Sequence, residues 1–157
     1  MGEAGKDALR VGFDRAIRLA LHGAKVSSDA GLFPYRDLDD AAQLTESAAA
    51  HLFDFRTGTN IRHSMTALLR QSIYSRLAGY EDVNDAERLS VDPVMRHVVG
   101  GRAADRHAAS ISQVGRFETD VLTHLHNLAA LMNMPGQWVD LIRQRRPIRN
   151  LILDMDS

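Results

Sequence analysis

The sequence contains no cysteine, which excludes a disulfide and a metal site built on thiolates. It also has no apolar run long enough to span a membrane, and residues 1–16 lack the apolar core of a signal peptide. We therefore expect a cytoplasmic protein without a membrane partner. The 157 residues, of which 45% are hydrophobic and 25% charged, suffice for one domain with a buried core.

Lysine is almost absent as well, since only Lys6 and Lys25 occur among the 19 basic residues and the rest are arginine. A guanidinium group forks onto phosphate and guanine better than an ammonium group does, which suits DNA binding. A GC-rich coding sequence produces the same bias, so both interpretations stay open. The formal net charge of −1 excludes a uniformly basic chain, and any DNA-binding surface must therefore be local.

The apolar spacing predicts a mainly α fold with a short β element near the N-terminus and a strand at the C-terminus. Residues 11–26 alternate apolar positions before a His-Gly-Ala turn, which predicts a strand or short hairpin. Helical spacing is found over residues 32–42, 45–55, 64–78, 85–89, 94–99, 112–133 and 137–144. The range 112–133 predicts one long core helix that ends before Pro135. The segment Leu151-Ile152-Leu153 predicts an interior strand.

Local residue signals refine these helices. Thr45 is the expected N-cap of the second helix, and Gly79 is the expected stop of the third. Pro93 fits the first turn of the helix that follows Asp92. Asp39, like its neighbour Asp40, is expected to face solvent.

A basic stretch from residue 96 to residue 116 has four arginines against the single acid Asp105. Within it, residues 104–120 follow a glycine turn and have the form of a helix-turn-helix, with Ser110 or Ser112 as the N-cap. An ordinary helix start with solvated polar residues fits equally well. The candidate DNA-binding residues are Arg96, Arg102, Arg106, Ser112, Gln113 and Arg116.

A second arginine run lies close to the C-terminus, at Arg143, Arg145 and Arg146. Such a run is either a solvated link or a clamp on a DNA strand. After it, Asp154 and Asp156 are two residues apart, so on a strand their carboxylates point to the same side. The same Asp-x-Asp ending resembles the start of haloacid-dehalogenase-type phosphotransferases, although there it precedes most of the fold.

Several separated motifs, in order, resemble the bacterial insertion-sequence DDE transposases of group one (insertion-sequence family 1380). They are HGAKVSSDAGL, RTGTNIRHSMTALLRQSIYSRLAGYEDVND, a GGR turn, SQVGRFE and LDMDS, and together they cover nearly the whole chain. The resemblance implies an RNase H-like sheet in which three carboxylates hold two Mg²⁺ ions for phosphodiester chemistry. It makes Asp156 the first catalytic aspartate and metal ligand, with Asp154 as the alternative.

From these observations we expect a helical DNA-binding and interaction region at residues 1–145. Residues 146–157 are then expected to form the first strand of a truncated RNase H-like catalytic domain. The expected function is that of an N-terminal transposase fragment that binds double-stranded transposon-end DNA in transposition. Because the family's other two carboxylates lie downstream of this motif, catalysis by the chain alone is not expected. The alternative is a helical interaction or dimerisation module without DNA binding, and whether the chain forms a homodimer stays open.

Overall fold

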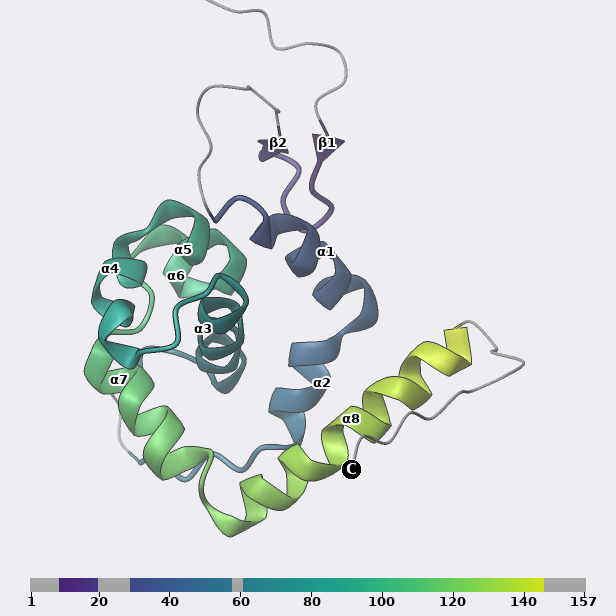
Figure 1. Ribbon diagram of the computed structural model, residues 1–157, viewed down its shortest axis with the longest axis vertical. Helices are drawn as coiled ribbons and strands as arrows, with labels where there is room; N and C mark the ends of the chain where they lie inside the picture. The colour runs from purple at the N-terminus through teal and green to yellow at the C-terminus, as the bar shows by residue number, and fades with distance from the viewer. Residues whose placement is uncertain (1–8, 20–28, 58–60, 146–157) are drawn as a thin grey trace, which may run out of the picture.

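The computed structural model describes residues 9–19, 29–57 and 61–145, and helices make up nearly all of this part (Figure 1). The α-helices are α1 (Leu32–Ala42), α2 (Leu44–His51), α3 (Met65–Leu77), α4 (Ala86–Val91), α5 (Pro93–Val99), α6 (Arg102–Asp105), α7 (Ile111–Arg116) and α8 (Leu125–Arg145). A 3-10 turn, η1 (Val83–Asp85), precedes α4, and a π-helical turn, η2 (Phe117–Val121), follows α7. In Figure 1, α4 to α7 lie on one side of α3 and α1 and α2 on the other, while α8 runs outward.

The predicted β structure is wrong for the described residues. Only β1 (Leu9–Arg10) and β2 (Arg18–Leu19) pair, as an antiparallel ladder of two residues on each side. The segment between β1 and β2 contacts α1. Asp37 Oδ1 of this helix accepts hydrogen bonds from the backbone N–H groups of Gly12 (2.7 Å) and Phe13 (3.0 Å). A helix side chain therefore takes the donors that a sheet would use, and the described part forms a helical fold without the sheet of an RNase H-like core. The strand expected over residues 151–157 lies outside the described residues.

Helix α3 is the central element, and its bounds follow from local signals as predicted. Ser64 is its N-cap and accepts a hydrogen bond from the Ala67 N–H group, and Gly79, with φ +85°, stops the chain after it. The helix contacts α2, α5 and α7. Leu69 packs in one hydrophobic cluster with α2 and α8, and Tyr74 packs in a second cluster with α1 and α5. Because α3 joins both clusters, it sets the positions of the helices around it.

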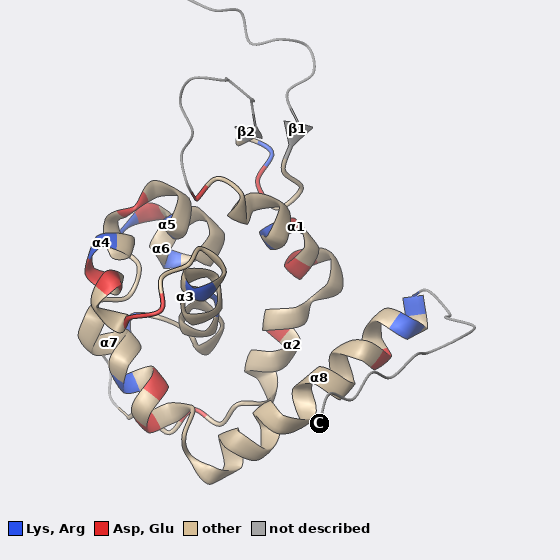
Figure 2. Ribbon diagram, in the orientation of Figure 1, with Lys and Arg blue, Asp and Glu red and all other residues tan. Residues whose placement is uncertain are grey.

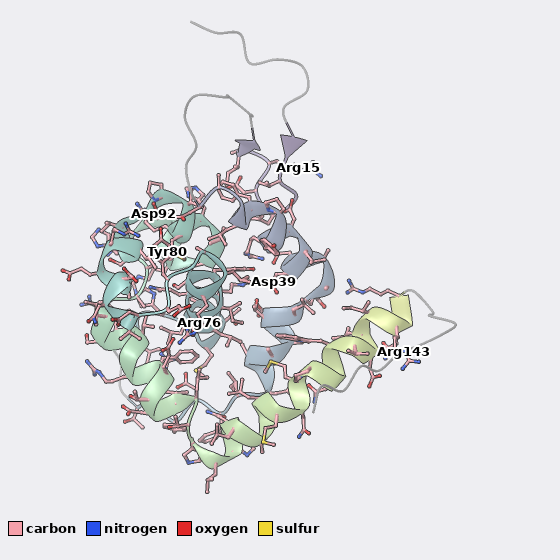
Figure 3. The ribbon with its side chains drawn as sticks, in the orientation of Figure 1. Arg15, Asp39, Arg76, Tyr80, Asp92 and Arg143 are labelled. Carbon is pink, nitrogen blue, oxygen red and sulfur yellow. The ribbon has the colours of Figure 1, made fainter. Side chains whose placement is uncertain are left out.

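The break between α1 and α2 is stabilised by Asp39, which was expected in solvent but is buried. Its carboxylate accepts hydrogen bonds from the Thr45 N–H group (2.7 Å), the Thr45 hydroxyl and the Tyr74 hydroxyl (2.8 Å). Thr45 therefore lies inside α2 and is not its N-cap; that position belongs to Gln43, whose φ is +55°. Figure 3 shows Asp39 in the space between α1 and α3.

The single long helix predicted over residues 112–133 is also wrong. Helix α7 ends at Arg116, η2 adds one wide turn, and α8 starts only at Leu125. It then passes through Pro135 without ending and reaches Arg145. Apolar spacing continues across the break because Phe117 and Val121 of η2 and Met134 of α8 are all buried in the same hydrophobic cluster, so the pattern alone could not show the break. None of the described helices is both long enough and apolar enough to cross a lipid bilayer.

Candidate nucleic-acid interface

A hollow of about 940 Å³ opens between residues 61–63 and the helices α5, α6 and α7. All six residues that the sequence nominates between positions 96 and 116 line it: Arg96, Arg102, Arg106, Ser112, Gln113 and Arg116. Arg62 and His63 enter the same hollow from the segment before α3. We call this surface the arginine groove. It collects five arginines and one carboxylate, that of Asp105, so its lining is strongly basic although the chain is not.

The α5–α6 corner fixes two of these arginines. Gly100 (φ +74°) and Gly101 (φ +57°) make the turn that starts α6, in backbone conformations that other residues rarely adopt. Arg96 donates from Nε to the Ala103 carbonyl (3.0 Å) and from Nη2 to the Ala104 carbonyl (2.8 Å), so it satisfies the free carbonyls of α6. Arg96 is therefore partly structural. Arg102 and Arg106, one helical turn apart, are exposed at the groove.

The start of α7 forms the opposite wall. Its N-cap is Ser110, and Gln113 Oε1 accepts from the Ser110 N–H group (3.0 Å) and lies 3.2 Å from the Ser110 hydroxyl. The Ser112 carbonyl accepts a hydrogen bond from Arg116 Nε at 3.2 Å. Gln113 thus has a capping role that the sequence analysis did not assign. The helix-turn-helix stays a prediction, since α6 is only four residues long and α7 six.

Arg62 and His63 are the residues that sequence reasoning missed. They stand far along the chain from the basic stretch, and they reach it because α3 packs against α5 and α7. The His63 imidazole is buried, and its carbonyl accepts a hydrogen bond from Arg56 Nη1 (3.1 Å). They lie within the RTGTNIRHSM motif and directly before the Ser64 cap, and neither signal reveals which distant segment they approach.

Three of the groove arginines lack the carboxylate partners that four arginines elsewhere in the fold have. Away from the groove, Arg36, Arg56, Arg70 and Arg76 all pair with carboxylates. By contrast, Arg62, Arg102 and Arg106 make no side-chain hydrogen bond or ion pair with any described residue. An arginine cluster without counter-charges is a surface ready for an anion.

The state of His63 reports the same positive field. Burial lowers the pKa of this imidazole below its ordinary value, and the charges of Arg102, Arg62 and Arg56 lower it further. His63, whose pKa is lowered, therefore lies close to the positively charged side chains of arginines. Any polyanion that neutralises those cations will ease protonation of the imidazole.

Two arginines of the second run, Arg143 and Arg145, do not line the groove. Arg143 is exposed near the end of α8, where Figure 2 shows basic residues well separated from those of α5 to α7. Figure 3 labels Arg143 there, far from Asp92 at the start of α5. Arg145 Nη1 donates a hydrogen bond to the Ala41 carbonyl of α1. Arg146 lies outside the described residues.

The described residues do not fit a metal centre, because no three histidine, aspartate or glutamate side chains among them lie close enough to hold an ion. Asp39 and Glu118, which are shielded from solvent, bind arginines instead. The two candidate ligands for Mg²⁺, Asp154 and Asp156, are outside the part of the chain that the structure describes.

Comparison with known proteins adds one match. A family model described as "Transposase DDE domain group 1" matches residues 9–157, a range that includes every residue of the arginine groove. No curated protein matches, and no solved structure does.

Proposed function

The chain belongs to the group 1 DDE transposase family, and from this premise we propose that its arginine groove binds the DNA of the transposon end. Transposases act in DNA transposition, so their substrate is DNA. The observation that carries the proposal is the meeting of Arg62, Arg102 and Arg106 in one hollow without a carboxylate partner among the described residues. Phosphate groups supply the missing counter-charge, and the guanidinium fork matches two phosphate oxygens.

Within this proposal the groove residues divide by chemistry. The arginines contact phosphates, which positions the DNA but carries no sequence information. Ser112 and Gln113 lie on the first turn of α7, whose last residue is Arg116, and they offer a hydroxyl and an amide Nε2 group that suit contacts to base edges. Asp105 also lines the groove, and its negative charge limits how closely the DNA phosphates approach that part of the groove.

We also propose the finer family assignment, to insertion-sequence family 1380, and Asp156 as the first catalytic aspartate with Asp154 as the alternative. Both rest on the sequence motifs. For the described residues the proposal is DNA binding without strand cleavage, because Asp39, Asp40 and Glu118 are committed to arginine partners. No catalytic step is assigned to them.

The test is a fluorescence-anisotropy titration of a duplex of about 20 base pairs at two salt concentrations. Each phosphate contact makes the negative slope of log affinity against log salt steeper by about 0.9, so loss of three contacts makes it shallower by about 2.7. We expect the triple variant Arg62→Ala, Arg102→Ala, Arg106→Ala to bind at least about tenfold more weakly, with that smaller slope. Arg15→Ala, an exposed arginine outside the groove (Figure 3), is the matched control. Equal binding by both variants would refute the proposal.

A helical interaction module is the second candidate function, and α8 is the observation in its favour. Its side chains Leu125 and Met132 are 83% and 82% exposed, and Val139 and Ile142 are also exposed. Large apolar side chains gathered on one helix favour a protein contact. Light scattering coupled to size-exclusion chromatography distinguishes a homodimer from a monomer, independently of DNA.

A further inference from the structure

Four rings form a cluster beside the extended segment that follows α2. Phe53 lies 6.1 Å from Phe55 and 6.1 Å from His126 between ring centroids, and Phe55 lies 4.8 Å from His124. We call these four residues the aromatic cluster. Both imidazoles are exposed, and the Phe53 side chain is 56% exposed. The cluster thus leaves aromatic side chains partly exposed to solvent, whereas proteins ordinarily bury most of such surface.

Asn127 fixes the cluster on a rigid backbone. This fully buried side chain accepts a hydrogen bond at Oδ1 from the Phe53 N–H group (2.7 Å). Its Nδ2 group donates to the carbonyls of Phe53 (3.0 Å) and Val121 (2.8 Å). The contacts join the extended segment, η2 and α8 at one point. Asn127 binds both the N–H group and the carbonyl of Phe53, so the backbone that carries this exposed ring is fixed in place.

The aromatic cluster is continuous with the arginine groove. A second hollow of about 660 Å³ is lined by Phe55 and Arg56 and shares Arg62, His63, Gln113 and Arg116 with the groove. Phe55 therefore connects the exposed rings to the same basic surface. Asp120 also lines this hollow and is its one acidic side chain. Cations followed by stacking surfaces form the arrangement that suits a single nucleic-acid strand.

We propose that the aromatic cluster binds unpaired bases of a DNA strand whose phosphates lie along the arginine groove. This inference rests on the proposed function and adds a substrate class to it. A paired duplex hides its base faces in the stack, so only frayed, flipped or single-stranded bases reach the Phe53 ring. The basic lining selects a polyanion over an apolar peptide, because a peptide would leave Arg62 and Arg116 without counter-charges. Base stacking tolerates any sequence, since every base has a π face.

The experiment compares three labelled DNAs: a blunt duplex, the same duplex with unpaired thymine tails, and the same duplex with abasic tails of equal length. Tails are placed on the 3′ ends in one set and on the 5′ ends in another. We expect the whole chain to bind the thymine-tailed DNA of one polarity, 3′ or 5′, about tenfold more tightly than the blunt duplex. DNA with abasic tails is expected to bind no more tightly than the blunt duplex. Abasic tails keep the phosphates, so they separate stacking from charge.

Phe53→Ala and Phe53→Leu are expected to abolish the preference for thymine tails while blunt-duplex affinity stays unchanged. Phe53→Trp retains a stacking surface and is expected to keep it. Met132→Ala, which removes an exposed apolar side chain of α8 outside the aromatic cluster, is the control. Arginine-dependent binding that is equal for all three DNAs would overturn this inference and leave the proposed function standing. No arginine-dependent binding to any of them would overturn both.

Discussion

Gln71 and Ala109 exchange two hydrogen bonds across the interior of the protein. Gln71 Nε2 donates to the Ala109 carbonyl at 2.8 Å, and Gln71 Oε1 accepts from the Ala109 N–H group at 2.7 Å. Gln71 is buried in α3, and Ala109 lies in the connection between α6 and α7. The Gln71 side chain thus satisfies both backbone groups of Ala109. It holds the segment that carries Arg106 and Ser110 against α3.

Gln71→Leu is expected to destabilise the fold by about 2 to 4 kcal/mol, because both backbone groups of Ala109 would be buried without partners. Urea denaturation followed by circular dichroism measures this loss. Gln144→Leu, the same substitution at an exposed position of α8, is expected to change stability by less than about 0.5 kcal/mol. Equal stability of the two variants would show that the Gln71 contacts do not hold the connection.

Asn127→Leu tests the point where η2, α8 and the extended segment meet. The substitution removes three hydrogen bonds, among them those to the N–H group and the carbonyl of Phe53, so we expect a loss of about 2 to 4 kcal/mol. Asn133→Leu, at an exposed position on the same helix, is the control for helix propensity. Denaturation midpoints that shift alike for both variants would contradict the assignment.

The Arg76–Glu118 pair predicts a pH dependence of stability. Arg76 Nη1 and Nη2 donate to the two carboxylate oxygens at 2.8 and 3.0 Å, and these bonds hold the pKa of Glu118 below its ordinary value of 4.5. Because the folded pKa is lowered, the stabilisation is full above 4.5 and is lost as pH falls through the folded pKa. Arg76 is half exposed, so solvent screens the pair and Glu118→Gln is expected to cost about 1 kcal/mol near pH 7.

The measurement is the unfolding free energy of wild type and Glu118→Gln between pH 7 and pH 3. The difference between the two is expected to shrink below pH 4.5 as the wild-type carboxyl is protonated. A difference that stays constant over this range would assign the loss to packing and not to charge.

His63 predicts that DNA binding takes up a proton. Burial, followed by the charges of Arg102, Arg62 and Arg56, lowers its pKa below 6.5, and phosphates in the groove would cancel the arginine contribution. Binding should therefore strengthen more steeply between pH 7.5 and pH 5.5 in wild type than in His63→Gln. Other histidines contribute to both proteins equally, so the difference between the two curves isolates His63. Parallel curves would refute the linkage.

Elements fixed by local chemistry were predictable from the sequence. Gly79 follows the end of α3, and Pro93 stands in the first turn of α5, as the sequence indicated. These signals act within one or two helical turns, so no knowledge of distant segments is needed. The predictions that were wrong concern segments whose structure depends on contacts with distant parts of the chain. Gly12 and Phe13 bind Asp37 instead of a strand, which no pattern within residues 11–26 could show.

Only the part of the arginine groove formed by residues 96–116 could be predicted from the sequence. Four arginines between positions 96 and 116 stood out by charge, and Ser112 and Gln113 by their place at a helix start; all six line one hollow, whereas their DNA contacts stay a prediction. Arg62 and His63 were missed because their approach depends on how α3 packs against α5 and α7. The aromatic cluster escaped notice for the same reason, since Asn127 joins residues 74 positions apart in the sequence.

The most direct test of the proposal that the arginine groove binds DNA is a titration of the ¹⁵N-labelled protein with duplex DNA, followed through the arginine Nε–Hε signals in an NMR spectrum. We predict that the signals of Arg62, Arg102, Arg106 and Arg116 shift together as DNA is added. Arg36 and Arg70 are already paired with Asp39 and Asp40, so their signals should stay in place. Shifts confined to Arg143 and Arg145 at the end of α8, or no shifts at all, would contradict a DNA-binding role for the arginine groove.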